Sequence, residues 1–447
     1  MSDALAVRYA KQVPRYTSYP TAPHFHAGVD SASYADWLTT LPEDSALSLY
    51  VHVPFCDRLC WFCGCHTKQV LRYDPIAAYL PVVIKEIQTV AGLLDGRGRA
   101  VALHLGGGSP SMLAPDDMVR LGTVARELFG EADGFEFSIE IDPNDMTPDR
   151  YEAFARAGVT RISVGVQDFD PKVQAAINRP QTYEQTRAVV DGMRDRGVGS
   201  VNLDVLYGLP HQTVASVEAT IELVLSMRPD RIALFGYAHV PWMKTHQKMI
   251  DEAALPDLTA RFAQSQAAAA KLLAAGYEAI GIDHFALPTD SLAVAAKTGA
   301  LHRNFQGYTT DAAPVLLGFG ASAIGALPQG HLQNVTATGE YMRHVNETGL
   351  AVARGIALNS DDRMRGWVIE RLMCDFAVSA RELTHRFGDA AQPLLAELQE
   401  VAADDDNVRI EDDAFVVSAA GRPFVRSIAA RFDSYFGTGA ARHSASV

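Results

Sequence analysis

The chain of 447 residues is poor in cysteine and in positive charge. Only five of its residues are cysteine, too few and too clustered for the disulfide framework of a small secreted protein. Its 39 lysine and arginine residues are outnumbered by 53 aspartate and glutamate residues, which gives a formal net charge of −14. Such a charge argues against a general nucleic-acid-binding or anionic-membrane-binding protein. An anionic substrate would therefore need a local basic pocket.

Long hydrophobic runs are also missing. No basic region followed by an apolar stretch opens the chain, so the sequence predicts no signal peptide and we expect a cytoplasmic location. The longest segment without charged side chains, residues 312–338, is interrupted by glycines and prolines, which predicts buried strands and loops rather than a membrane span. The overall balance of 48% hydrophobic and 21% charged residues is typical of a soluble globular protein.

What the sequence does have is a repeated alternation of apolar strands and amphipathic helices. The predicted strands cover residues 47–53, 100–105, 135–141, 161–166, 201–206 and 231–238. The predicted helices between them include residues 75–94, 115–129, 183–196 and 214–227. Strands that alternate with helices form parallel sheets. Six such units without a clear seventh and eighth predict an α/β fold with an open, partial (β/α)6 barrel.

Composition divides the chain into three parts. We expect residues 1–45 to form an N-terminal arm and residues 46–339 to form the barrel with an extension. In residues 340–447 we expect helices without strands between them, apart from a hairpin at 407–418. Helices combined with such a hairpin predict a small, mainly helical, winged-helix-like domain at the C-terminus.

Four of the five cysteines lie within ten residues, directly after the first predicted strand. Cys56, Cys60 and Cys63 form a Cys-x3-Cys-x2-Cys loop, and Cys65 follows. Three thiolates at this spacing can hold three irons of a four-iron cluster and leave the fourth iron open to a small chelating ligand. Two alternatives remain open. One is a closed cluster with Cys65 as fourth ligand, and the other is a zinc site, which usually takes a second pair of ligands elsewhere.

Polar residues collect at the ends of the other predicted strands. Because parallel strands of a barrel end on one face, we expect Glu140 and Asp204 at one rim with the glycine-rich turn at residues 106–109. Glycines there let a ligand approach the backbone, and Glu140 can hold the ribose hydroxyls or the amino group of an adenosyl ligand. Either acid has an alternative role as a structural carboxylate at a helix N-terminus. His52 is a candidate proton donor or a core histidine bonded to backbone.

The segment around the cysteines reads Tyr50-Val51-His52-Val53-Pro54-Phe55-Cys56 and continues through Cys65. It closely resembles the oxygen-independent coproporphyrinogen III oxidases, a family of the radical S-adenosylmethionine (SAM) superfamily. Further segments that resemble this family are residues 15–21, 106–110, 165–169, 204–210 and 302–310. The resemblance therefore covers nearly the whole chain.

This resemblance implies a radical decarboxylation in haem biosynthesis. Reductive cleavage of SAM gives a 5′-deoxyadenosyl radical, which removes a β-hydrogen from a substrate propionate before carbon dioxide leaves and a vinyl group remains. Two propionates of coproporphyrinogen III react in turn to give protoporphyrinogen IX. The implied partners are this substrate and an unidentified electron donor and acceptor. Neither a nucleic acid nor a membrane span is expected, and the chain is expected to be a monomer.

Family site residues carry over by position. The resemblance implies that Cys56, Cys60 and Cys63 bind a 4Fe–4S cluster, while Cys65 lies outside it and is a catalytic candidate together with His52. Two SAM molecules are implied. The residues that match the first SAM site are Tyr50, Gly107, Glu140, Ala238 and Ile324. The residues that match the second SAM site are Phe62, Gly108, Ser109, Gln167, Arg179 and Asp204.

Two other functions compete with this interpretation. Some relatives share the cysteine loop but carry haem as chaperones; these typically lack the arm at residues 15–21 and the fourth cysteine, and both are present here. An iron–sulfur electron carrier would not need polar strand ends such as Glu140 and Asp204. Among the arginines, Arg15 and Arg303 lie in family-like segments and are candidates for holding substrate propionates.

Overall fold

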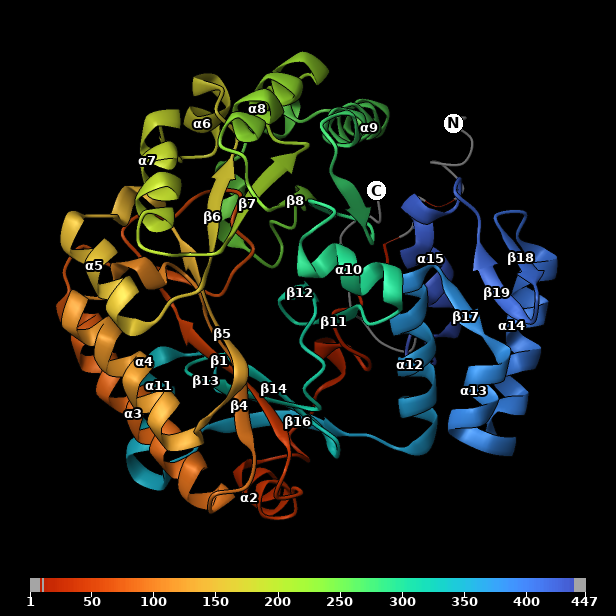
Figure 1. Ribbon diagram of the computed structural model, residues 1–447, viewed down its shortest axis with the longest axis horizontal. Helices are drawn as coiled ribbons and strands as arrows, with labels where there is room; N and C mark the ends of the chain where they lie inside the picture. Colours follow the sequence, from red (N-terminus) through yellow and green to blue (C-terminus); the bar gives the residue numbers. More distant parts are fainter. Residues whose placement is uncertain (1–8, 10–11, 438–447) are drawn as a thin grey trace.

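The structure of the protein, a computed structural model, describes residue 9 and residues 12–437. Its centre is a strongly curved sheet of 12 strands in the order β16-β15-β14-β13-β1-β4-β5-β6-β7-β8-β10-β9 (Figure 1). The strands that run parallel side by side are β13 (Val315–Phe319), β1 (Ala46–Val53), β4 (Arg99–Gly107), β5 (Glu131–Ile141), β6 (Arg161–Gln167), β7 (Ser200–Tyr207) and β8 (Arg231–Gly236). Parallel strands covered on both faces are apolar along most of their length, which is why the sequence predicts them.

Helices cover the outer side of the barrel (Figure 1). They are α3 (Asp74–Leu94), α4 (Pro115–Phe129), α5 (Pro148–Ala157), α6 (Pro171–Ala176), α7 (Tyr183–Arg194), α8 (Val214–Ser226) and α9 (Leu258–Ala274). α7 and α8 begin after Thr182 and Thr213, each of which forms a capping box that satisfies free backbone N–H groups of the first turn. The six predicted strands and the four helices predicted between them are confirmed.

Beyond the predicted six strands, the sheet extends on both sides. β13 lies parallel to β1, with Tyr50 opposite Gly318, although more than 250 residues separate the two strands in sequence. The antiparallel strands that extend the sheet are β14 (Ile324–Leu327), β15 (Gly330–Asn334) and β16 (Val352–Ala357) on one side, and β10 (His284–Ala286) and β9 (Glu278–Ile280) on the other. Because β13, β14 and β15 lie within residues 312–338, the interpretation of that segment as buried strands and loops is confirmed.

One helix, α3, is long and apolar enough to cross a membrane by length and composition alone, but half of its apolar window is buried inside the fold. It packs against α2 (Ser31–Thr39), α4 and α11 (Thr338–Thr348). Its buried Glu86 accepts hydrogen bonds from the hydroxyl of Tyr341 at 2.7 Å and from the N–H of Gly320 at 2.8 Å. α3 is therefore a core helix of the barrel.

The C-terminal part lies beside the barrel and is mainly helical (Figure 1). Its elements are α12 (Ser360–Asp375), β17 (Ala377–Ser379), α13 (Ala380–Phe387), α14 (Gln392–Asp404), β18 (Val408–Glu411), β19 (Ala414–Val417) and α15 (Val425–Ala429). β17, β19 and β18 form a small sheet, as a winged-helix-like arrangement requires. The expectation of helices uninterrupted by strands is wrong at β16 and β17. Both are short edge strands, whose periodicity is too brief to register in the sequence.

The N-terminal arm lies against the C-terminal part. The guanidinium of Arg426 in α15 donates a hydrogen bond to the carbonyl oxygen of Val13 at 2.8 Å. A hairpin of β11 (His302–Asn304) and β12 (Gly307–Thr309) also reaches the arm, because Arg303 donates to the carbonyl oxygen of Arg15 at 3.4 Å. Arm, hairpin and α15 thus meet at one place. The division into an arm, a barrel and a C-terminal domain stays a prediction.

Candidate active site

The cysteine loop leaves the sheet at the carboxyl end of β1. Its ends pair as two short parallel strands, β2 (Phe55–Cys56) and β3 (Lys68–Gln69). The N–H of Lys68 donates to the carbonyl oxygen of Pro54 at 3.0 Å, and the N–H of Val70 donates to that of Cys56 at 2.9 Å. This pairing closes the loop at its base, so the cysteines lie on a closed ring of backbone.

A segment that follows β6 holds the first half of the loop. The N–H of Trp61 donates to the carbonyl oxygen of Ile177 at 2.9 Å, and the side-chain amide of Asn178 donates to that of Leu59 at 3.0 Å. The predicted SAM contact Phe62 packs, with Trp61, against a buried apolar cluster that includes Ile177. Polar and apolar contacts together fix this half of the loop.

Residues just after β8 hold the second half. Lys244 Nζ donates to the carbonyl oxygen of Cys65 at 2.9 Å, and His246 Nε2 donates to that of Cys63 at 2.8 Å. The amide of Gln247 donates to the carbonyl oxygen of the residue before Cys63 at 2.9 Å. Sequence analysis missed these three residues. Their signal is a group of polar side chains just past the carboxyl end of a parallel strand, where barrel sites are built.

The predicted cluster ligands differ from Cys65 in exposure. Cys60 is buried, Cys56 and Cys63 are half-buried, and Cys65 is exposed. Among the described residues, no three His, Cys, Asp or Glu side chains converge closely enough to hold a single metal ion. A zinc ion draws its ligands to one centre, whereas in a cubane each sulfur binds a different iron, so a 4Fe–4S cluster does not require such convergence.

A hydrogen-bonding group lies beside each of the three sulfurs. The pairs are Thr67 Oγ1 with Cys56 Sγ at 3.0 Å, Arg179 Nη1 with Cys60 Sγ at 3.5 Å, and the N–H of Cys65 with Cys63 Sγ at 3.3 Å. Donors of this kind stabilise thiolates, and they tune the reduction potential of an iron–sulfur cluster. The surroundings of the three sulfurs therefore suit iron ligands.

The thiols also differ in acidity. Burial raises the pKa of Cys56 to about 12 and also raises that of Cys60, although Arg179 opposes the effect at Cys60. The hydrogen bond between the side chains of Cys63 and Cys65 lowers the pKa of Cys63 to about 7, and it raises the pKa of Cys65. Cys63 is therefore closest to a thiolate at neutral pH, and iron binding must displace protons from the other two ligands.

Arg179, predicted to contact a SAM molecule, is buried beside the loop. Its guanidinium forms an ion pair with Asp142 at 3.0 Å and donates to the carbonyl oxygen of Gly165 at 3.2 Å. Its Nε is buried and has no hydrogen-bond partner in the part of the chain that the structure describes. Buried donors are nearly always paired in folded proteins. The free Nε therefore fits a site that a polar ligand completes.

Glu140 stands at the end of β5, beside the glycine-rich turn. Its carboxylate accepts the N–H of Gly107 at 3.1 Å and lies 3.5 Å from His104 Nε2. Burial acts to raise the pKa of Glu140, but the hydrogen bonds from His104 and Gly107 outweigh it, and the pKa lies below its ordinary value. Because Gly107 belongs to β4, Glu140 is not the cap of a helix. An ionised carboxylate held in this way can bind an amino group or ribose hydroxyls.

The glycines of the turn make room for protein atoms. Gly107 has a φ of +113°, and a Cβ there would lie 2.5 Å from the ring of His52. A Cβ at Gly108 would lie 2.5 Å from the carbonyl oxygen of Phe55. The packing of the turn against β1 and the cysteine loop therefore requires glycine at both positions, and the expectation that the missing side chains also let a ligand approach the backbone stays a prediction. Contact of Gly107 and Gly108 with SAM stays a prediction.

His52 has a hydrogen-bond partner on each ring nitrogen. Its Nε2 donates to the carbonyl oxygen of His66 at 2.8 Å, so its Nδ1 accepts from the hydroxyl of Tyr50 at 2.9 Å. Burial lowers the pKa of His52, which keeps the ring neutral near pH 7. The side chain of His66 in turn donates to the carbonyl oxygen of Thr336 at 2.7 Å. This chain of contacts links Tyr50 to the far end of the cysteine loop.

The remaining residues predicted for the second SAM molecule lie in the carboxyl-terminal halves of neighbouring strands or just after them. Asp204 in β7 accepts from the amide of Asn202 at 2.8 Å, and burial raises its pKa. The hydroxyl of Ser109 donates to the carboxylate of Asp145. Gln167 ends β6 in a left-handed backbone conformation with a φ of +63°. The structure therefore brings these residues to one rim, as the parallel topology predicts.

Ala238 and Ile324, predicted for the first SAM molecule, lie on different sides of the rim. Ala238 follows β8, and its carbonyl oxygen accepts from the amide of Gln247 at 3.2 Å. Ile324 begins β14, and its carbonyl oxygen would lie 2.5 Å from a Cβ at Gly318, the residue opposite Tyr50. Ala238 is thus tied to the cysteine loop, and Ile324 lies next to the end of β1.

The chain is similar over its whole length to proteins of one kind. Residues 50–224 match the Radical SAM superfamily, and residues 358–424 match the HemN C-terminal domain. The chain is 48% identical to the oxygen-independent coproporphyrinogen III oxidase of Bradyrhizobium diazoefficiens, with 100% of both chains covered. It is 46% identical to that of Paracoccus denitrificans, over 98% of this chain and 97% of the relative. It matches the solved structure of coproporphyrinogen III oxidase (HemN) from Escherichia coli, a radical SAM enzyme, with a TM-score of 0.90, 37% identity and coverage of 95% of this chain and 100% of that one.

Proposed function

The chain belongs to the family of oxygen-independent coproporphyrinogen III oxidases, and from this we propose that it converts coproporphyrinogen III to protoporphyrinogen IX in haem biosynthesis. Two propionate side chains lose carbon dioxide and become vinyl groups. The observation that carries the proposal is the closed loop of Cys56, Cys60 and Cys63 at a polar barrel rim, in a chain similar over its full length to these oxidases.

The three cysteines would hold a 4Fe–4S cluster, and the rim beside them would hold SAM. When bound and reduced, this pair of groups supplies a 5′-deoxyadenosyl radical that removes the β-hydrogen of a propionate. The protein's part is to shape the site. Thr67, Arg179 and the N–H of Cys65 contact the sulfurs, and the contacts from Lys244 and His246 keep the loop in place.

We further propose that the predicted SAM contacts act as two sets. Glu140 supports the first set, because it stays ionised and is held by the N–H of Gly107. Arg179 supports the second set through its buried, unpartnered Nε, which would donate to a polar group of SAM. His52 would fix the hydroxyl of Tyr50, and Cys65 would act next to the cluster without binding it.

Each decarboxylation also needs an electron to start and an acceptor for the electron left on the substrate. A separate electron donor and a separate acceptor are part of the proposal. We also propose that the protein acts as a cytoplasmic monomer. Its long apolar helix α3 is a core helix, and Asn178, Lys244 and His246, which hold the cysteine loop, belong to the same chain as the loop.

The test is anaerobic turnover by protein reconstituted with iron and sulfide, in the presence of a reductant, SAM and coproporphyrinogen III. We expect two molecules of carbon dioxide for each protoporphyrinogen IX formed, together with 5′-deoxyadenosine. Stoichiometric haem binding without release of carbon dioxide would instead identify a haem chaperone.

A further inference from the structure

A cavity of about 510 Å³ lies between the barrel and the C-terminal part. Its size is that of ordinary ligand pockets, which run from about 300 to 1,000 Å³. β8 and α9 form one side, and the N-terminal arm, β11 and α15 contribute to the other. Ala238 also lines the cavity. The side-chain amide of Gln247 donates both to the carbonyl oxygen of Ala238 and to the cysteine loop. The cavity therefore adjoins the candidate active site.

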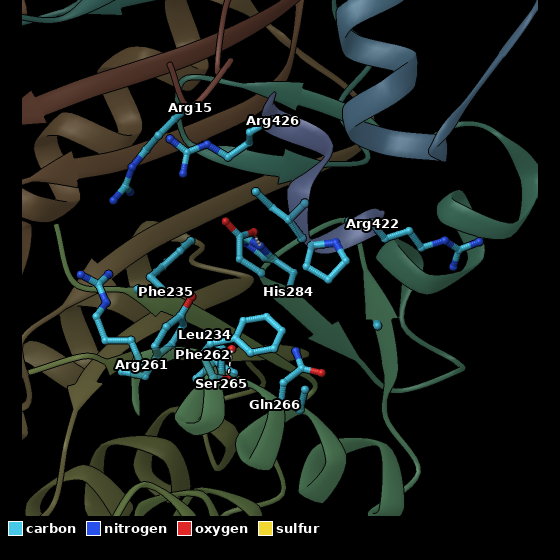
Figure 2. A pocket seen from close by; sticks show the side chains of 18 of the residues that line it. Arg15, Leu234, Phe235, Arg261, Phe262, Ser265, Gln266, His284, Arg422 and Arg426 are labelled. Carbon is cyan, nitrogen blue, oxygen red and sulfur yellow. Dashed lines mark hydrogen bonds and ion pairs between the residues drawn. The ribbon is translucent and has the colours of Figure 1, made fainter. Parts of the chain in front are cut away.

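Four of the five arginines that line this cavity come from four separate segments: Arg15 of the arm, Arg261 of α9, Arg303 of β11 and Arg426 of α15. Figure 2 shows the guanidinium groups of Arg15, Arg261 and Arg426 toward the left of the view, whereas that of Arg422 points to the right, away from them. Cations that converge from distant parts of a chain with a net charge of −14 form the local basic pocket that an anionic substrate requires.

Two of these arginines keep unused hydrogen-bond donors. Nε of Arg261, and Nε and Nη1 of Arg303, are buried and have no partner among the residues that the structure describes. The cations also repel one another. Burial, together with the charges of Arg15 and Arg303, lowers the pKa of Arg426 to about 10. Like charges in close proximity and the unused buried donors of Arg261 and Arg303 are both unfavourable, and an anion that pairs with these groups removes both penalties.

One carboxylate, Asp283, faces the same arginines. Its side chain is 17% exposed and lies 2.7 Å from Nδ1 of His284. Burial acts to raise the pKa of Asp283, but His284, Arg303 and Arg15 hold it below its ordinary value, so the carboxylate is ionised. Four arginines around one carboxylate leave the cavity with an excess of positive charge and a single anionic acceptor.

We propose that this cavity binds coproporphyrinogen III, with Arg15, Arg261, Arg303 and Arg426 taking its propionates and Asp283 accepting hydrogen bonds from its pyrrole N–H groups. The proposal rests on the proposed function. Coproporphyrinogen III carries four carboxylates on its periphery and four N–H donors near its centre. The carboxylates complement the arginines of the cavity, and the N–H donors complement the carboxylate of Asp283. The side chains of Phe235 and Phe262 supply apolar surface for the macrocycle (Figure 2).

The arginines are tested by the kinetics of the reconstituted holoenzyme. Arg303→Gln and Arg261→Gln should each raise KM for coproporphyrinogen III about ten- to a hundredfold, the effect of losing a charge-assisted pair, while iron content and SAM affinity stay at the wild-type level. Arg303→Lys should lie in between, because it keeps the charge and loses the fork of donors. The control is Arg187→Gln, which removes a surface arginine paired with Asp191 and should leave KM unchanged.

The role of Asp283 has a test of opposite sign. If this carboxylate only repelled the propionates, Asp283→Leu would lower KM. If Asp283 accepts hydrogen bonds from pyrrole N–H groups, Asp283→Leu should instead raise KM about tenfold or more. Asp283→Asn should raise KM less, because it keeps an acceptor oxygen.

Each result bears on one proposal. Wild-type enzyme that turns over normally, with KM unchanged in both glutamine variants, would overturn the assignment of the arginines. A lower KM in Asp283→Leu would overturn the assignment of Asp283. A wild-type enzyme that releases no carbon dioxide would overturn the proposed function itself. Equilibrium binding of coproporphyrinogen III to the same variants would then decide the site, because loss of binding in Arg303→Gln supports it and wild-type affinity contradicts it.

Discussion

The cysteine loop and the cavity lined by Arg15, Arg261, Arg303 and Arg426, here called the arginine cavity, differ in how their hydrogen-bonding groups are paired. In the loop, donor and acceptor both belong to the protein. Lys244 and His246 donate to loop carbonyl oxygens, and each predicted ligand sulfur has a hydrogen-bonding neighbour. In the cavity, Arg261 and Arg303 keep buried donors without partners among the described residues. The comparison teaches that contacts within the protein position the backbone of the loop, whereas the cavity keeps buried donors that an anion would pair.

The largest effect is expected at the sulfurs. Cys56→Ala, Cys60→Ala or Cys63→Ala should each abolish the absorption of the cluster and the formation of 5′-deoxyadenosine, because three ligands are the minimum that holds a cubane. Cys65→Ala should keep its iron and lose turnover. Cys374→Ala, which removes a buried thiol outside the loop, serves as the control and should keep both. Loss of iron from the Cys65 variant would point to a closed cluster with four protein ligands.

The next effect is expected at the buried ion pair beside the loop. Arg179→Gln leaves the carboxylate of Asp142 without its 3.0 Å partner, so the free energy of unfolding should fall by about 3 to 5 kcal/mol. Adding Asp142→Asn removes the uncompensated charge and should recover part of that loss. Denaturant unfolding of the two single variants and the double variant measures the coupling. Strictly additive effects would mean that the pair does not support the loop.

Smaller effects are expected where side chains hold the loop backbone. His246→Ala and Gln247→Leu each remove one hydrogen bond to the cysteine loop, worth about 1 kcal/mol, and should speed the loss of iron to a chelator about fivefold. Gln247→Leu also removes the contacts of this side chain with Ala238 and Val240, so its effect should be the larger of the two. The matched control is His344→Ala in α11, a half-buried histidine whose side chain contacts Arg343 and not the cysteine loop. If chelation proceeds at the wild-type rate in both loop variants, residues 244–247 do not hold the cluster site.

The smallest effect is expected when the iron is removed. Because the cavity arginines come from the arm, α9, β11 and α15 and not from the loop, the apo-protein should bind coproporphyrinogen III with nearly the affinity of the holoenzyme. Hydrogen exchange should rise in residues 56–69 and stay unchanged in α15. Loss of substrate binding on iron removal would show that the two sites are not independent.

The same comparison explains how far the sequence alone could lead. The six barrel strands and the cysteine loop were predictable, because apolar periodicity and a ten-residue motif are local. β13 was not predicted as a barrel strand, because its partner β1 lies more than 250 residues away. Lys244, His246 and Gln247 were missed for a similar reason, since their partners lie on a separate loop.

The arginine cavity shows the limit most clearly. Arg15 and Arg303 were candidates because they lie in family-like segments, but Arg261 and Arg426 sit in helical segments where an arginine is most often a surface residue. Only the fold brings the four together with Asp283. The buried donors of Arg261 and Arg303 that lack a hydrogen-bond partner among the described residues are a property of packing and leave no trace in local sequence.

The most direct test follows the hydrogen atom. Coproporphyrinogen III deuterated at the β-carbons of its propionates is supplied to the reconstituted protein, and 5′-deoxyadenosine is analysed by mass spectrometry. We predict one deuterium in the 5′-deoxyadenosine for each molecule of carbon dioxide released. Release of carbon dioxide with unlabelled 5′-deoxyadenosine, or haem binding with no carbon dioxide at all, would contradict the proposal that this site cleaves a propionate C–H bond.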